Sequence, residues 1–72
     1  MDKALIGKRL TDLRGEQARE GVAERLGISL SALQMYENGQ RIPRDEIKMK
    51  IARYYNSSVE DIFFTPLPHK SC

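Results

Sequence analysis

The 72 residues of this chain are enough for one domain, and a domain of this size buries only about 60% of the surface that its unfolded chain exposes. Hydrophobic residues make up 40% of the chain, with three tyrosines, two phenylalanines and no tryptophan, so we expect a small helical core, no enclosed substrate pocket and no enzyme activity. The net charge of +2 permits a polyanionic partner without requiring one.

Residues suited to a catalytic or metal site are few. The single cysteine is Cys72, which excludes an intramolecular disulfide and a cysteine-based metal site. The single histidine, His69, has no second ligand near it, and the acidic residues do not pair with a nucleophile and a base. No apolar run approaches the roughly 18 residues that a membrane span needs. We therefore expect no catalytic residue, no metal, no cofactor and no membrane contact, and a cytoplasmic location.

Helical spacing of apolar residues begins near the N-terminus. A first helix is predicted over residues 3–16, although Gly15 weakens its end. A second, shorter helix follows after a brief connection, and Gly27 ends it. The apolar stripe of the first helix is Ile6, Leu10 and Leu13, and that of the second is Val22, Ala23 and Leu26.

A third helix is predicted in the middle of the chain. The Ser29 hydroxyl is suited to accept a hydrogen bond from a free backbone N–H at its start, and the helix runs to Glu37. Asn38 and Gly39 then form a turn signal, and Pro43 lies in an extended connection.

Two further helices complete the prediction. The fourth begins at Asp45, and Asn56 is suited to end it in the left-handed conformation. Ser58 and Asp61 resemble a capping box that opens a short fifth helix. No strand pattern appears. The sequence therefore predicts an all-α fold of five helices in residues 1–65, followed by a mobile C-terminal tail over residues 66–72.

The outer face of the third predicted helix carries almost no charge. Projection at about 100° per residue places Leu33 at the centre of the inner face. The outer side and its edges hold Leu30, Ser31, Gln34 and Met35. Uncharged amides and hydroxyls can hydrogen-bond to base edges in the major groove of DNA, and apolar groups can pack on thymine methyls. A packing surface for a partner helix is an equally good interpretation of this face alone.

The residues before this helix favour the DNA interpretation. In "VAERLGISLSALQMYENGQRIP", Ala23 is small where two helices approach and Gly27 lies in the turn, which is the spacing of a helix-turn-helix. Together with "YYNSSVEDIFF", this stretch resembles the Cro/CI-type phage repressors, also called the XRE family of helix-turn-helix regulators. The resemblance spans about Ile6 to Phe64. It implies a five-helix, lambda-repressor-like domain whose third helix reads the major groove.

The resemblance also assigns roles by position. It implies base-facing sites at Leu30, Ser31, Gln34 and Met35, and backbone contacts at Arg19, Asn38 and Arg41, to which Arg44 adds a second arginine beside Arg41. It implies a buried salt bridge between Arg14 and Glu37. This chain departs from the family at the start of the second helix, where Ala18 replaces a serine or threonine cap and Arg19 replaces a glutamine.

We therefore expect a sequence-specific regulator that binds double-stranded DNA as a homodimer on a palindromic operator and acts as a repressor. The alternative is an antitoxin or adaptor of the same fold whose main partner is a protein. Aromatic residues near the C-terminus favour a contact between two copies, with Phe64 and either Ile62 or Tyr54 at the dimer interface. A dimer would place two third helices in successive major grooves.

Overall fold

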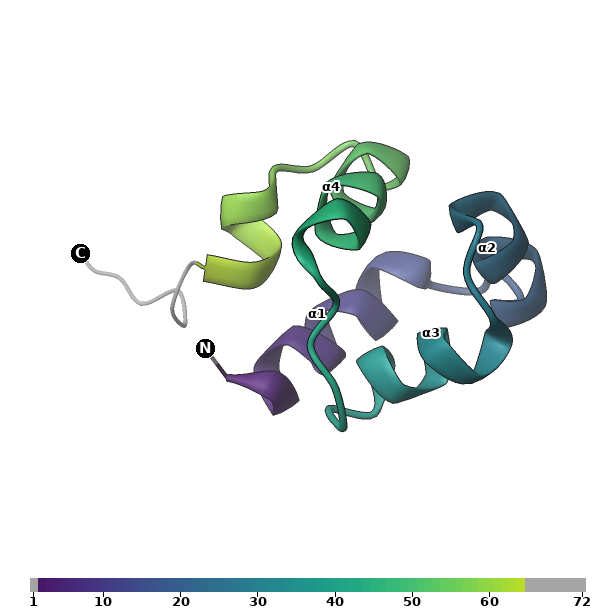
Figure 1. Cartoon of the computed structure of the whole chain (residues 1–72), viewed down its shortest axis with the longest axis horizontal. Helices are drawn as coiled ribbons and strands as arrows, with labels where there is room; N and C mark the ends of the chain where they lie inside the picture. The colour runs from purple at the N-terminus through teal and green to yellow at the C-terminus, as the bar shows by residue number, and fades with distance from the viewer. Residues whose placement is uncertain (1, 65–72) are drawn as a thin grey trace.

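A computed structural model describes residues 2–64, and in this part of the chain all regular structure is helical (Figure 1). The elements are α1 (Lys3–Arg14), α2 (Arg19–Leu26), α3 (Leu30–Glu37), α4 (Asp45–Tyr54) and a short π-helix, η1 (Glu60–Phe64). The predicted all-α fold with five helices is confirmed. The predicted tail over residues 66–72, with His69 and Cys72, lies outside the described residues.

Side-chain caps begin three of the helices. Asp2 Oδ1 accepts hydrogen bonds from two backbone N–H groups in the first turn of α1, at 3.0 and 3.2 Å. Ser29 Oγ accepts from the N–H of Ala32 at 3.0 Å, and Ser58 Oγ accepts from the N–H of Asp61 at 3.0 Å. Each cap satisfies a donor that the helix itself leaves free, which explains why α3 and η1 start where the sequence predicted.

Positive φ angles end the helices. Gly15 has φ 59°, and α1 therefore ends at Arg14, two residues before the predicted end. Gly27 has φ 71° and closes α2 in the left-handed conformation. Asn56, at φ 56°, adopts the same region just after α4, as its sequence position indicated.

All five helices contribute to a single core. The buried apolar residues are Ile6, Leu10, Val22, Ala23, Leu26, Leu33, Tyr36, Ile51, Ala52, Ile62 and Phe63. Leu13, which the spacing placed on the inner stripe of the first helix, is instead exposed at the end of α1. α1 packs most extensively against α3, and Figure 1 shows α3 along an outer edge of the bundle with α1 on its inner side.

α1 lies close to the backbone at the end of α3 at Gly7. A Cβ atom at this position would collide with the backbone carbonyl of Glu37 and lie 3.0 Å from the backbone nitrogen of Gly39. The absence of a side chain at Gly7 therefore lets α1 pack directly on the end of α3. This contact sets where α3 ends relative to the rest of the bundle.

Candidate nucleic-acid interface

The turn between α2 and α3 consists of Gly27, Ile28 and Ser29. The N–H of Ile28 donates to the carbonyl of Ala23 at 3.0 Å, which closes α2, and Ser29 caps α3 directly afterwards. Ala23 is buried, and Ile28 packs against the core from the turn. Two helices of eight residues joined by a three-residue turn of this kind form a helix-turn-helix unit.

The outer face of α3 holds the four residues to which base-facing roles were assigned. Ser31 and Met35 are exposed, and Leu30 and Gln34 are half-buried at the edges of the face. None of these four side chains forms a hydrogen bond or ion pair with another residue in the described range 2–64. Their polar groups are therefore available to an external partner.

The connection from α3 to α4 carries the predicted phosphate-binding residues. Asn38 is exposed directly after α3, where its N–H donates to the carbonyl of Gln34 at 2.8 Å. Arg41 and Arg44 are both exposed, and Arg44 occupies the position before the first turn of α4. The connection that follows α3 thus carries two exposed arginines, whereas the outer face of α3 itself carries no charge.

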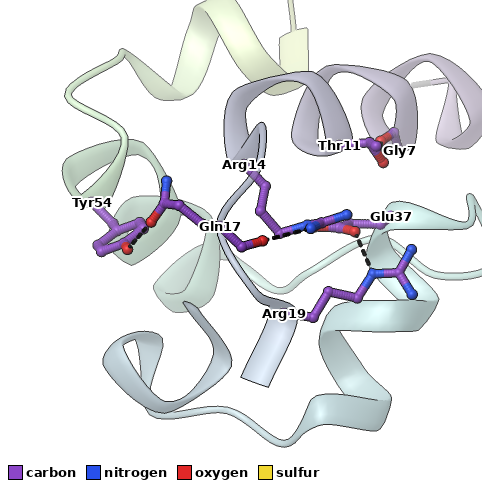
Figure 2. A network of polar contacts seen from close by, with 7 residues as sticks. All are labelled: Gly7, Thr11, Arg14, Gln17, Arg19, Glu37 and Tyr54. Atoms are coloured by element: carbon purple, nitrogen blue, oxygen red, sulfur yellow. Dashed lines mark hydrogen bonds and ion pairs between the residues drawn. The ribbon is translucent and has the colours of Figure 1, made fainter. Parts of the chain in front are cut away.

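Glu37, the last residue of α3, is the centre of a buried ion network (Figure 2). Its side chain has 0% exposure, and its Oε2 lies 2.8 Å from Nε of Arg14, whose side chain is 14% exposed. The other carboxylate oxygen, Oε1, lies 2.9 Å from Nε of Arg19, whose side chain is 36% exposed. The resemblance implied only the bond to Arg14. The structure adds Arg19, so one carboxylate joins α1, α2 and α3.

The network continues into the connection between α1 and α2. Nη1 of Arg14 donates to the backbone carbonyl of Gln17 at 2.7 Å, and Oε1 of Gln17 accepts from the Tyr54 hydroxyl at 2.7 Å (Figure 2). Ala18, which precedes α2, makes no side-chain cap. The short connection is therefore held by Arg14 from one side and by Tyr54 of α4 from the other.

The predicted dimer residues do not form one surface. Ile62 is 2% exposed and belongs to the core, so its assignment to an interface was wrong. Tyr54 is half-buried and its hydroxyl is bound to Gln17, whereas Phe64 lies near the other end of α4. Phe64 is 54% exposed, as is Met49 on α4.

Met49 and Phe64, together with Val59, line a groove of about 380 Å³ between α4 and η1. We call these three residues the α4–η1 patch. Lys48 borders it, with its Nζ 5.0 Å from the centre of the Phe64 ring and 3.6 Å from Asp45 Oδ1. Sequence reasoning missed Met49, although its position off the apolar stripe of the fourth helix indicated an exposed side chain. Gln17 gave no signal, because it lies in an irregular connection.

Other kinds of site are not found in the described part of the chain. Among residues 2–64, no group of three or more histidine, cysteine, aspartate or glutamate side chains is arranged to hold a metal ion. The helices in that range are all too short or too polar to cross a bilayer.

A helix-turn-helix whose second helix presents an uncharged face and is followed by exposed arginines is typical of a DNA-binding module. A family model described as helix-turn-helix matches residues 17–62, which is more than half of the chain. The chain therefore belongs to this helix-turn-helix family, the Cro/CI-type or XRE family of DNA-binding transcriptional regulators.

The fold is also similar to a solved structure. The solution structure of the SOS-response transcriptional repressor LexA from Eubacterium rectale superposes with a TM-score of 0.81 over 97% of this chain and 83% of that chain, at 22% sequence identity. At this identity, the similarity shows the fold alone. A search of curated protein sequences finds no match.

Proposed function

We propose that this protein is a transcriptional repressor that binds a palindromic operator as a homodimer and reads it with α3. The observation that carries the proposal is the uncharged outer face of α3, whose side chains have no hydrogen-bond or ion-pair partner in residues 2–64 and which is followed by exposed arginines in the connection to α4. A helix face that enters the major groove needs groups that match base edges, while positive charge is needed at the margins, where the phosphates lie.

Gln34 is the principal base reader in this proposal. A glutamine amide can pair with adenine through two hydrogen bonds, and such a pair discriminates against a wrong base by about 1–3 kcal/mol. Ser31 binds a base or a phosphate, and Leu30 and Met35 cover thymine methyl groups. Asn38, Arg41 and Arg44 bind phosphates and fix the position of α3 in the groove, and Arg19 does so from the start of α2.

Two copies are required because one short helix makes few base contacts, too few to select one site in a genome. In a two-fold dimer, the two α3 helices lie about 34 Å apart and enter successive major grooves. The α4–η1 patch is the proposed contact between copies, because it is the described region where two large apolar side chains, Met49 and Phe64, are most exposed. Repression follows from occupancy of a promoter, which needs no activating surface.

The test begins with selection of bound sites from a random DNA library. Fluorescence anisotropy then compares Gln34→Ala with the wild type on the selected site and on a scrambled duplex. We expect about a 5- to 150-fold loss on the selected site, equivalent to about 1–3 kcal/mol, and little change on the scrambled one. Gln40→Ala removes the same amide from the connection after α3 and should not change the preference between the two duplexes.

Two outcomes contradict the proposal. Equal losses on both duplexes for Gln34→Ala exclude base reading by this residue. A wild type that selects no sequence and shows no dependence on salt is an adaptor or antitoxin whose partner is a protein, because phosphate binding releases counterions and must depend on salt.

A further inference from the structure

We propose that Glu37 is a positioning residue that holds one edge of the Arg19 guanidinium and turns the other edge to a DNA phosphate. Position 19 then requires an arginine specifically, and a lysine cannot replace it. The inference rests on the proposed function, because it takes a phosphate as the external partner of Arg19.

The geometry divides the guanidinium into a bound edge and a free edge. Nε of Arg19 lies 2.9 Å from Glu37 Oε1, and Arg14 occupies the other carboxylate oxygen. Nη1 and Nη2 of Arg19 form no hydrogen bond with any residue in the range 2–64. Figure 2 shows these two atoms on the side of Arg19 that points away from Glu37. The side chain is 36% exposed, so the free edge reaches solvent.

The burial of Glu37 fixes the edge of the Arg19 guanidinium that is bound to it. The Glu37 side chain has 0% exposure, and its contacts with two arginines come from separate helices that already pack on α3. A charged group without access to water is held to its partners far more strongly than a surface pair. The Arg19 guanidinium is therefore kept in place before any DNA arrives, and less conformational entropy is lost on binding.

The bound edge also determines where the free edge lies. Glu37 is the last residue of α3, and Asn38 follows it into the connection that carries Arg41. The free edge of Arg19 consequently lies beside the end of α3, where the connection that carries Asn38 and Arg41 begins. A phosphate there would meet two parallel N–H donors, which is the geometry in which a guanidinium binds phosphate most strongly.

An arginine can hold two anions apart on separate edges of its guanidinium, and a lysine has no such separate edges. The guanidinium has five N–H donors distributed around a plane, whereas the lysine ammonium is one compact charge on a flexible chain. A lysine at position 19 carries its three N–H donors on one nitrogen, so it could bind both anions only if the phosphate came directly against the buried carboxylate of Glu37, and it would offer the phosphate no parallel pair of donors. Arg41 is different, because it is exposed and has no partner within residues 2–64, so a lysine there keeps a free charge for the phosphate.

Four variants test this difference: Arg19→Ala, Arg19→Lys, Arg41→Ala and Arg41→Lys. The readout is the slope of log K against log salt for a nonspecific duplex, measured by fluorescence anisotropy on the full chain. Each phosphate contact contributes about 0.9 to this slope. We expect both alanine variants and Arg19→Lys to lose about one unit of slope, and Arg41→Lys to keep the wild-type slope. Thermal unfolding should show all four variants folded.

The outcomes separate the inference from the function on which it rests. A wild-type slope for Arg19→Lys overturns positioning by Glu37, since charge alone would then suffice. A wild-type slope for Arg19→Ala overturns it as well, because Arg19 would then contact no phosphate. If Arg41→Ala loses slope in the same experiment, the proposal of DNA binding still stands. No slope for the wild type overturns the DNA-binding proposal itself.

A second measurement reports on the bound edge without DNA. In the free protein, the Nε–H proton of Arg19 should exchange with water more slowly than that of Arg41, as seen by NMR of ¹⁵N-labelled protein. Glu37→Gln should abolish this protection, because the amide gives neither arginine a charged acceptor. Equal exchange rates for the two arginines in the wild type would overturn the inference, whatever the stability of the Glu37 variant.

Discussion

Glu37 and Tyr55 each have a polar group that the fold buries, with opposite results. Glu37 has a cation on each carboxylate oxygen, at 2.8 and 2.9 Å, so its burial is compensated. The Tyr55 hydroxyl is also buried, but it has no hydrogen-bond partner in the described part of the chain. A buried ion network adds little net stability and fixes one arrangement of helices. An unsatisfied hydroxyl only costs stability.

Removal of the Tyr55 hydroxyl should therefore stabilise the protein. We expect Tyr55→Phe to raise the free energy of unfolding by about 1–2 kcal/mol at neutral pH, because an unsatisfied buried polar group costs about 1–3 kcal/mol. Chemical denaturation measures the change. Tyr54→Phe is the matched control: its hydroxyl donates to Gln17 at 2.7 Å, and its loss should lower stability by about 0.5–1.5 kcal/mol. A lower stability for Tyr55→Phe would mean that the hydroxyl does have a partner.

Tyr55 also makes the stability of the protein depend on pH in the alkaline range. Burial, and after it the negative charge of Glu37, raises the pKa of Tyr55 from 10.0 to about 12. The folded protein thus holds the phenol proton more tightly than the unfolded chain does. This contribution to stability is complete below pH 10 and is lost as the pH rises to about 12. The advantage of Tyr55→Phe over the wild type should therefore widen across this interval.

Among the helices, α1 depends on a glycine and α2 does not. A Cβ at Gly7 would meet the backbone of Glu37 and Gly39, whereas a Cβ at Gly21 of α2 would have no atom within 4 Å. Alanine is the better helix former at both positions by about 1 kcal/mol. Only at Gly7 does the neighbouring backbone oppose this gain.

Gly7→Ala and Gly21→Ala should consequently change stability in opposite directions. We expect Gly21→Ala to raise the free energy of unfolding by about 0.5–1 kcal/mol. Gly7→Ala should lower it by about 1–3 kcal/mol, since α1 must move away from the end of α3. Denaturant midpoints of the two variants give the answer, and a stabilised Gly7→Ala would show that α1 can shift without loss of packing.

Helix ends were predictable from the sequence because their signals are local. Ser29, Gly27 and Asn56 each act within a few residues of their own position, through a cap or a left-handed φ angle. The outer face of α3 was predictable for a similar reason, since a regular helix repeats every 3.6 residues.

Two features were not predictable, for different physical reasons. The burial of Ile62 is one of them, because η1 has only five residues and no repeat of apolar positions along it identifies its inner face. The bond between Arg19 and Glu37 joins residues 18 positions apart and exists only because α2 packs beside the end of α3. No periodicity along the chain encodes such a contact.

The assembly is expected to depend on the α4–η1 patch. Phe64→Asp places a charge in this patch and should give a folded monomer with weaker operator binding, because two linked recognition helices bind far better than one. Met35→Asp is the control: it places the same charge on the outer face of α3 and should weaken DNA binding while the dimer persists. Analytical ultracentrifugation measures whether the wild type and each of these two variants are monomers or dimers. A wild type that remains monomeric, or a Phe64→Asp variant that still dimerises, excludes this patch.

The outer face of α3 has a consequence for how this protein can change over generations. Ser31 and Met35 are exposed and make no polar contact within residues 2–64, so substitutions there carry little penalty in folding and, under the proposed function, would alter the preferred operator. Arg14, Arg19 and Glu37 have less freedom, because a change at Glu37 leaves both arginines without their anion and a change at either arginine removes a partner of the buried carboxylate. Under the same proposal, new binding specificities would arise by drift at Ser31 and Met35 while Arg14, Arg19 and Glu37 stay fixed. A lineage of such regulators can acquire new targets without first acquiring extra stability.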